Sequence, residues 1–159
     1  MVNFNNKWEP ILKKELLDFM SKAPMPTPTH DEYHVIRVLE YAKELSKGLN
    51  FDEDILVASV YFHDLGRHYP EGSGKHGGLS AKYAKPILEK IKFPKDKIFP
   101  VLEAIKLHDE ASDPSERKSV ESQILYDSDK LDFSGETGIA RWLVCPNLRG
   151  KNFDFHQTA

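Results

Sequence analysis

The chain has 159 residues, of which 40% are hydrophobic and 30% are charged, and its formal net charge is −3. This composition is typical of one globular domain with a buried core, and it argues against a disordered chain. The acidic balance disfavours nucleic acid as a partner, because non-specific binding of nucleic acid needs a basic surface. A metal ion could still supply local positive charge for a small phosphorylated substrate.

The single cysteine, Cys145, excludes an intrachain disulfide and is consistent with a reducing compartment. No run of about 18 apolar residues predicts a transmembrane helix. The first eight residues lack the basic-then-apolar order of a signal peptide. We therefore expect a soluble cytoplasmic protein without a membrane partner. Phe4, Trp8 and Trp142 could form a homodimer surface, although aromatic side chains lie more often in a core.

Segments with helical periodicity alternate along the chain with short breaks rich in Pro, Gly and Asp. No alternating β-branched stretch predicts a strand. The predicted helices cover residues 8–22, 31–47, 53–65, 79–92, 96–108, 119–131 and 139–144. We therefore predict an all-α fold, a single-domain bundle of about six to seven helices.

Local signals mark the ends of two of these helices. Thr29 and Glu32 have the spacing of a capping box at the start of the second helix. Asp52 is the expected N-cap of the third helix. Gly48 and Gly66 are expected to end the second and third helices, because glycine is favoured just after a helix.

An adjacent histidine and aspartate, His63 and Asp64, stand at the end of the most apolar predicted helix. A buried carboxylate without a partner is costly, and a bound cation removes that cost. His34 lies near the start of the preceding helix, and a short connection would bring it to the His63–Asp64 end. Asp129 could supply a fourth ligand from a later helix. Each residue alone has an ordinary structural explanation, but together they favour a metal site.

The sequence resembles the HD-domain phosphohydrolase superfamily, whose motif is a histidine, a His-Asp pair and a distant aspartate. The segments that carry the resemblance are residues 34–38, 58–66 and 127–132, followed by 135–141. The resemblance covers roughly residues 29–141, and it implies an HD-domain-like helical bundle. This bundle would hold a divalent metal through His34, His63, Asp64 and Asp129. In such proteins the metal activates a water that attacks phosphorus. Mn, Zn, Fe, Co, Ni and Mg all remain open as the metal.

The resemblance also implies a division of the chain into three parts. Residues 1–28 would form an N-terminal helix and a Pro-rich linker packed on the domain. Residues 29–145 would form the catalytic core, and residues 146–159 a polar tail. Within the core, the Gly-rich stretch 67–78 predicts a polar, mobile loop that covers the substrate.

Five further histidines need an interpretation. Related proteins with two metals use extra histidines in regions comparable to those of His76 and His108, so these two are candidate ligands of a second metal. The alternative is a solvent-exposed loop histidine and a histidine favoured at a helix end. His30, His68 and His156 are interpreted as surface residues.

A phosphorylated substrate needs cationic side chains as well as a metal. The candidate substrate-binding residues are Arg37, Arg67, Lys75 and Arg141. The candidate catalytic residues are Asp64, Asp127 and Lys130. Asp127 and Asp132 flank Asp129, and one of them could orient a ligand histidine or accept a proton. Solvated acids on the outer side of the helix are the alternative for both.

The favoured function is hydrolysis of a phosphoester or phosphoanhydride in a small phosphorylated substrate, with a nucleotide as the expected class. One alternative is a phosphodiesterase for cyclic or oligomeric nucleotides, which would need a binuclear site and would favour metal binding by His76 and His108. Another is a non-catalytic, metal-stabilised module that binds a ligand and regulates. Retention of all four ligand residues argues against this last alternative.

Overall fold

The computed structural model describes residues 6–27, 29–111, 113–134, 138 and 140. Its α-helices are α1 (Glu9–Lys22), α2 (Glu32–Leu45), α3 (Glu53–Phe62), α4 (Gly77–Lys90), α5 (Lys95–Glu110) and α6 (Val120–Ser134). Three short 3-10 helices accompany them: η1 (Leu65–His68), η2 (Pro70–Ser73) and η3 (Pro114–Glu116). The described residues contain no strand, so the predicted all-α class is confirmed.

Several expectations fall at the ends of the chain. The helix expected over residues 139–144, the tail 146–159, and the aromatic residues Phe4 and Trp142 lie outside the described residues. Trp8 is half-buried and packs on Phe93, with ring centroids 4.9 Å apart. None of the helices in the described part of the chain has both the length and the apolar character needed to cross a lipid bilayer.

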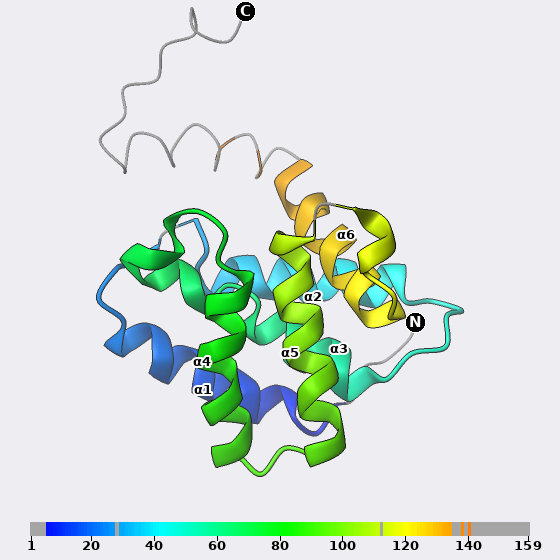
Figure 1. Ribbon diagram of the computed structural model, residues 1–159, viewed down its shortest axis with the longest axis horizontal. Helices are drawn as coiled ribbons and strands as arrows, with labels where there is room; N and C mark the ends of the chain where they lie inside the picture. The colour runs from blue at the N-terminus through cyan, green and yellow to red at the C-terminus, as the bar shows by residue number, and fades with distance from the viewer. Residues whose placement is uncertain (1–5, 28, 112, 135–137, 139, 141–159) are drawn as a thin grey trace, which may run out of the picture.

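Helix α3 is the centre of the bundle. Asp52 is its N-cap, as expected, and its side chain accepts hydrogen bonds from two backbone N–H groups in the first turn. All residues from 56 to 62 are buried, and α1, α2, α5 and α6 all pack against this helix (Figure 1). A helix that is apolar on all sides can only be stable inside the protein. The residues that follow its end, His63 and Asp64, are therefore placed deep in the protein.

The start of α2 differs from the expected capping box. Asp31 caps the helix in place of Thr29, and its Oδ1 accepts a hydrogen bond from the backbone N–H of His34 at 3.0 Å. Aspartate is at least as good an N-cap as threonine, so the helix loses nothing by the change. The Thr29 hydroxyl lies instead 3.0 Å from Nδ1 of the neighbouring His30.

The stretch 67–78 is folded more tightly than a mobile loop. It forms parts of η1 and η2 and the first residues of α4, and His76 is buried. Gly72 lies so close to η1 that a Cβ on it would collide with the carbonyl oxygen of Gly66. Only glycine permits this approach of the two backbones. The stretch is therefore a folded segment with a few buried residues, and the prediction that it covers a substrate stays a prediction.

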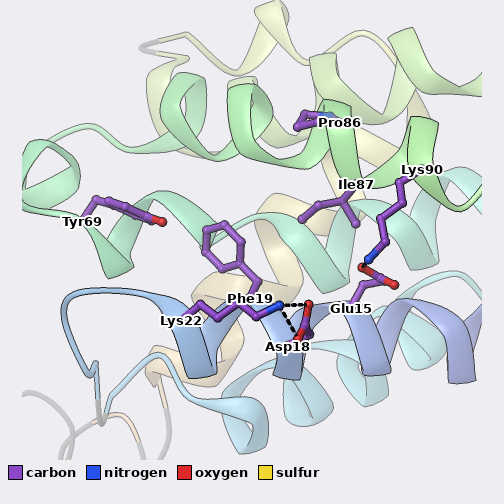
Figure 2. Close-up of a pocket in the computed structure, with 8 residues that line it drawn as sticks. All are labelled: Glu15, Asp18, Phe19, Lys22, Tyr69, Pro86, Ile87 and Lys90. Atoms are coloured by element: carbon purple, nitrogen blue, oxygen red, sulfur yellow. Dashed lines mark hydrogen bonds and ion pairs between the residues drawn. The ribbon is translucent and has the colours of Figure 1, made fainter.

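Helix α1 covers the side of the bundle formed by α3 and η1, and its Leu12 and Leu16 enter the core. Figure 2 shows a pocket of about 310 Å³ beside it. The pocket is lined by Glu15, Asp18, Phe19, Lys22, Tyr69, Pro86, Ile87 and Lys90. The Lys90 ammonium lies 2.7 Å from a carboxylate oxygen of Glu15, an ion pair that ties α4 to α1. Each lysine at this pocket is paired with an acid of α1, so its rim carries no net charge.

Candidate metal centre

Three helices bring four side chains to one buried point. Nε2 of His34, at the start of α2, lies 3.3 Å from Oδ2 of Asp64 and 3.5 Å from Oδ1 of Asp129 in α6. Nε2 of His63, at the end of α3, lies 3.3 Å and 3.8 Å from the same two oxygens. Ligands held tetrahedrally about 2.1 Å from a cation lie roughly 3.4 Å from one another. These four histidine–carboxylate separations are thus close to those between ligands of a single cation.

The partners of Nδ1 show which ring nitrogen of His34 and of His63 carries the hydrogen. Nδ1 of His34 lies 2.7 Å from Oδ2 of Asp132, and Nδ1 of His63 lies 2.8 Å from the carbonyl oxygen of Val60. Carboxylate and carbonyl oxygens accept hydrogen bonds, so both Nδ1 atoms are donors. In neutral rings the two Nε2 lone pairs then face each other across 3.2 Å. A cation between them would turn this repulsion into coordination.

The other oxygen of Asp64 faces a second pair of histidines. Nε2 of His76 lies 2.7 Å from Oδ1 of Asp64, and Nε2 of His108 lies 3.9 Å from it. The two Nε2 atoms are 3.0 Å apart. Two groups of ligand atoms are compact enough to hold a cation: His34 with His63 and Asp129, and His63 with Asp64 and His108. The structure therefore brings the candidate ligands of a second metal to the same centre.

The second pair differs from the first in its charge. Burial, followed by the neighbouring His63 and His76, lowers the pKa of His108 to about 3. Burial also opposes charge on His76, but Asp109 and Asp64 outweigh it and raise the pKa of His76 to about 9. Asp109 accepts a hydrogen bond from the backbone N–H of His76 at 2.6 Å, and the same oxygen lies 2.9 Å from ring Nδ1.

The two carboxylates at the centre are anionic although both are largely buried. Burial alone would raise the pKa of Asp64, but His63, His30 and His34 hold that pKa well below its usual value. Burial likewise opposes the anion of Asp129, whose pKa falls to about 2 mainly because of His63. Oδ2 of Asp64 is buried, and none of the described residues donates a hydrogen bond to it. A buried anionic oxygen without a donor is costly, and a cation is the partner that fits it.

Two predicted cationic residues lie at the centre, and one lies behind it. Nε of Arg67 is 4.0 Å from Oδ1 of Asp64, and the side chain is 22% exposed. The Lys130 ammonium is 2.8 Å from Oδ2 of Asp129. Arg37, expected to bind substrate, donates instead to Asp132, with an Nε–Oδ1 distance of 2.6 Å. Its guanidinium therefore stands on the Nδ1 side of the ligand histidine, away from the cation position.

Other candidates are not brought together with these residues. The Lys75 ammonium donates to a backbone carbonyl at the end of α5. Asp127 is exposed, because two residues along a helix place it about 200° around the axis from Asp129. The structure thus places Asp127 away from the candidate ligands, and its catalytic role stays a prediction. Arg141 and His156 lie outside the described residues.

Two histidines interpreted as surface residues are not on the surface. His68 is buried, and its Nδ1 lies 3.2 Å from the Thr27 hydroxyl. Nε2 of His30 lies 4.0 Å from Oδ2 of Asp64, so His30 faces the centre. His30 precedes the extended N-cap Asp31, so helical periodicity does not place it, and its approach to Asp64 depends on a tertiary contact.

Comparison with known proteins agrees with this geometry. The family model of the HD domain matches residues 32–134, well over half of the chain and all of the residues from His34 to Asp132 described above. The crystal structure of a predicted HD superfamily hydrolase from an uncultured Thermotogales bacterium is similar, with a TM-score of 0.67 and 25% sequence identity. The likeness covers 87% of this chain and 76% of that one. No curated protein matches the sequence.

Proposed function

Because this chain belongs to the HD domain family, we propose that it is a metal-dependent phosphohydrolase of a small phosphorylated compound, with nucleotides as the expected class. Family membership and the likeness to a predicted HD superfamily hydrolase support a metal-dependent hydrolase in general. The observation that carries the proposal is the buried Oδ2 of Asp64, which has no hydrogen-bond donor in the part of the chain that the structure describes and faces Nε2 atoms of His34 and His63 at 3.3 Å.

A divalent cation would be held by His34, His63, Asp64 and Asp129, with Mn, Zn, Fe, Co, Ni and Mg all compatible with this donor set. It would supply Lewis-acid chemistry, lowering the pKa of a water and neutralising charge on phosphoryl oxygens. The protein contributes orientation. Asp132 fixes the ring of His34, the carbonyl oxygen three residues earlier fixes His63, and Lys130 holds Asp129.

The surroundings of the centre favour an anionic substrate of small size. Without a cation, the two carboxylates would repel a phosphate, so substrate binding is expected to depend on the cation. Arg67 is partly exposed beside Asp64, where its guanidinium could bind a phosphoryl oxygen. The chain carries a net charge of −3, which disfavours a long polyanion and is compatible with a nucleotide.

One observation favours a second candidate function. His76 and His108 face Oδ1 of Asp64, so these three residues could hold a second cation. Two metals a few ångströms apart can stabilise both the attacking and the leaving oxygen of a phosphodiester. Phosphodiesterase activity on cyclic or oligomeric nucleotides would then be expected. The number of cations per active chain distinguishes this candidate from hydrolysis at a single metal.

The test uses the purified full chain, stripped of metal and reloaded separately with Mn²⁺, Co²⁺, Mg²⁺ or Zn²⁺. Release of phosphate or pyrophosphate is measured with nucleoside mono- and triphosphates, and opening of the ester is measured with cyclic and dinucleotides. We expect cation-dependent hydrolysis that falls at least about a thousandfold in Asp64→Ala, since one acid serves both halves of the centre. Glu44→Ala, an exposed acid on α2, is the matched control and keeps full activity.

The negative result is equally informative. A chain that binds a cation but hydrolyses none of these compounds would reject the phosphohydrolase proposal. A metal-stabilised module that binds a ligand without turning it over would then be the remaining candidate.

A further inference from the structure

Five histidines surround Asp64, and one of them differs from the rest. In four of them Nδ1 faces an oxygen that accepts hydrogen bonds, either a carboxylate or a backbone carbonyl. The rings of His34, His63 and His108 therefore present their Nε2 lone pairs to the centre, whereas the raised pKa of His76 keeps a proton on both of its ring nitrogens at neutral pH. The fifth, His30, has the hydroxyl of Thr29 beside its Nδ1, at 3.0 Å.

The hydroxyl allows His30 the opposite tautomer. A threonine hydroxyl can donate as well as accept, so the Thr29 hydroxyl can donate to Nδ1 of His30 and leave the ring hydrogen on Nε2. This Nε2 lies 4.0 Å from the buried Oδ2 of Asp64. A lone pair there would be repelled by the carboxylate, whereas an N–H group would be attracted to it. Electrostatics therefore favours His30 as a hydrogen-bond donor toward the centre.

The position of His30 separates it from the ligand histidines. Its side chain is 17% exposed, whereas those of His34 and His63 are fully buried. Its Nε2 is 4.0 Å from Oδ2 of Asp64, farther than the 3.3 Å of the two ligand rings. Its ring stands edge-on to that of His34, with centroids 5.6 Å apart. His30 is thus more exposed than the two ligand rings and farther from the carboxylate oxygen that they share.

We infer that His30 is a substrate-contacting residue, whose Nε2–H donates a hydrogen bond to a phosphoryl oxygen of the bound substrate. Arg67 lies near the opposite oxygen of Asp64, so the two donors would hold the phosphoryl group from both sides of that carboxylate. This inference rests on the proposed function, because it assumes a phosphorylated ligand at the cation.

The test measures binding of inorganic phosphate to the cation-loaded full chain by calorimetry, together with the cation content of each variant. In His30→Ala we expect phosphate to bind about tenfold more weakly, the loss typical of one hydrogen bond to a charged group. His30→Gln, whose amide can donate, should recover part of this loss. Thr29→Val, which removes the hydroxyl beside Nδ1, should weaken phosphate binding by a smaller factor. Cation content should stay unchanged in all three variants.

The outcomes separate this inference from the proposed function. Phosphate binding as in the wild type, or a loss of cation from His30→Ala, would overturn the role of His30 while leaving the hydrolase proposal intact. Failure of the wild-type, cation-loaded chain to bind phosphate would contradict both. A tenfold loss with full cation content supports the inference even if the physiological substrate has not been found among the nucleotides.

Discussion

The two halves of the centre share Asp64 but differ in charge. In the half built by α2, α3 and α6, Asp129 joins Asp64, so two carboxylates can balance a divalent cation. In the half built by α4 and α5, the histidines His76 and His108 face Asp64 without a second carboxylate at the same point. Coulomb attraction at short range therefore favours the first half. The two halves are therefore expected to differ in their affinity for a divalent cation although their ligand geometry is similar.

The oxygen atoms that lie beside Nδ1 of the histidines, by contrast, are of the same two kinds in both halves. In each half, Nδ1 of one histidine faces a carboxylate, and Nδ1 of the other faces the backbone carbonyl oxygen three residues earlier in the chain. Nδ1 faces a carboxylate in His34 and His76, and it faces a backbone carbonyl oxygen in His63 and His108. Because each of these rings has an oxygen within hydrogen-bond distance of its Nδ1, a difference in cation affinity between the halves would mainly reflect their difference in charge.

Removal of one histidine from each half tests this comparison with the largest expected effect. His34→Ala should lose the tightly held cation, and hydrolysis should fall by at least about a hundredfold. His108→Ala should keep one cation per chain and lose only the weaker one. Elemental analysis of dialysed protein gives the cation count, and kcat/KM gives the activity. Equal losses in the two variants would show that the halves bind as one unit.

Removing the charge of Asp132 or Asp109 tests the same comparison with a smaller expected loss of cation affinity. Asp132→Asn and Asp109→Asn each keep the side-chain shape but remove the charge behind a ligand ring. We expect cation affinity to fall about ten- to a hundredfold in each case. Titration calorimetry should assign the Asp132→Asn loss to the first cation bound and the Asp109→Asn loss to the second. The opposite assignment would contradict the order of affinities.

The smallest effect is expected far from the centre, at the start of α3. Burial opposes the anion of Asp54, but hydrogen bonds from Lys97 and Asn6 outweigh it and lower the pKa of Asp54. A carboxyl with a lowered folded-state pKa stabilises the protein above its ordinary pKa and loses that contribution as pH falls. Asp54→Asn should therefore cost about 1 kcal/mol of unfolding free energy at pH 7. The cost should shrink in acid.

Urea denaturation at pH 7 and in acid measures this change, and cation binding serves as its control. Asp54 lies at the other end of α3 from His63, so cation affinity should not change. A loss of cation affinity in Asp54→Asn would show that the first turn of α3 and the centre are coupled.

The helical framework and the first half of the centre followed from sequence for a physical reason. Helical periodicity marks which face of a helix is buried, and a short connection makes α2 and α3 antiparallel. Both signals are local, so His34 and the His63–Asp64 pair could be placed together before any coordinates. The N-cap at Asp52 is local in the same sense.

What sequence reasoning missed depends on contacts between distant residues. Arg37 looked available for substrate, but its partner Asp132 is 95 residues away. The Gly-rich stretch after η1 looked mobile, and only the close approach of Gly72 to Gly66 shows that it is packed. His30 was interpreted as a surface residue, and only the fold brings its ring near Asp64. In each case a tertiary contact overrode a local pattern.

The double contact of Asp109 links the centre to the secondary structure around it. One carboxylate oxygen accepts a hydrogen bond from the backbone N–H of His76, the N-cap of α4, and lies 2.9 Å from Nδ1 of the same residue. A cation that binds His76 would therefore also affect the first turn of α4. Amide hydrogen exchange at Gly77 and Gly78 should slow when the second cation is bound, so that these two glycines become a backbone reporter of metal occupancy.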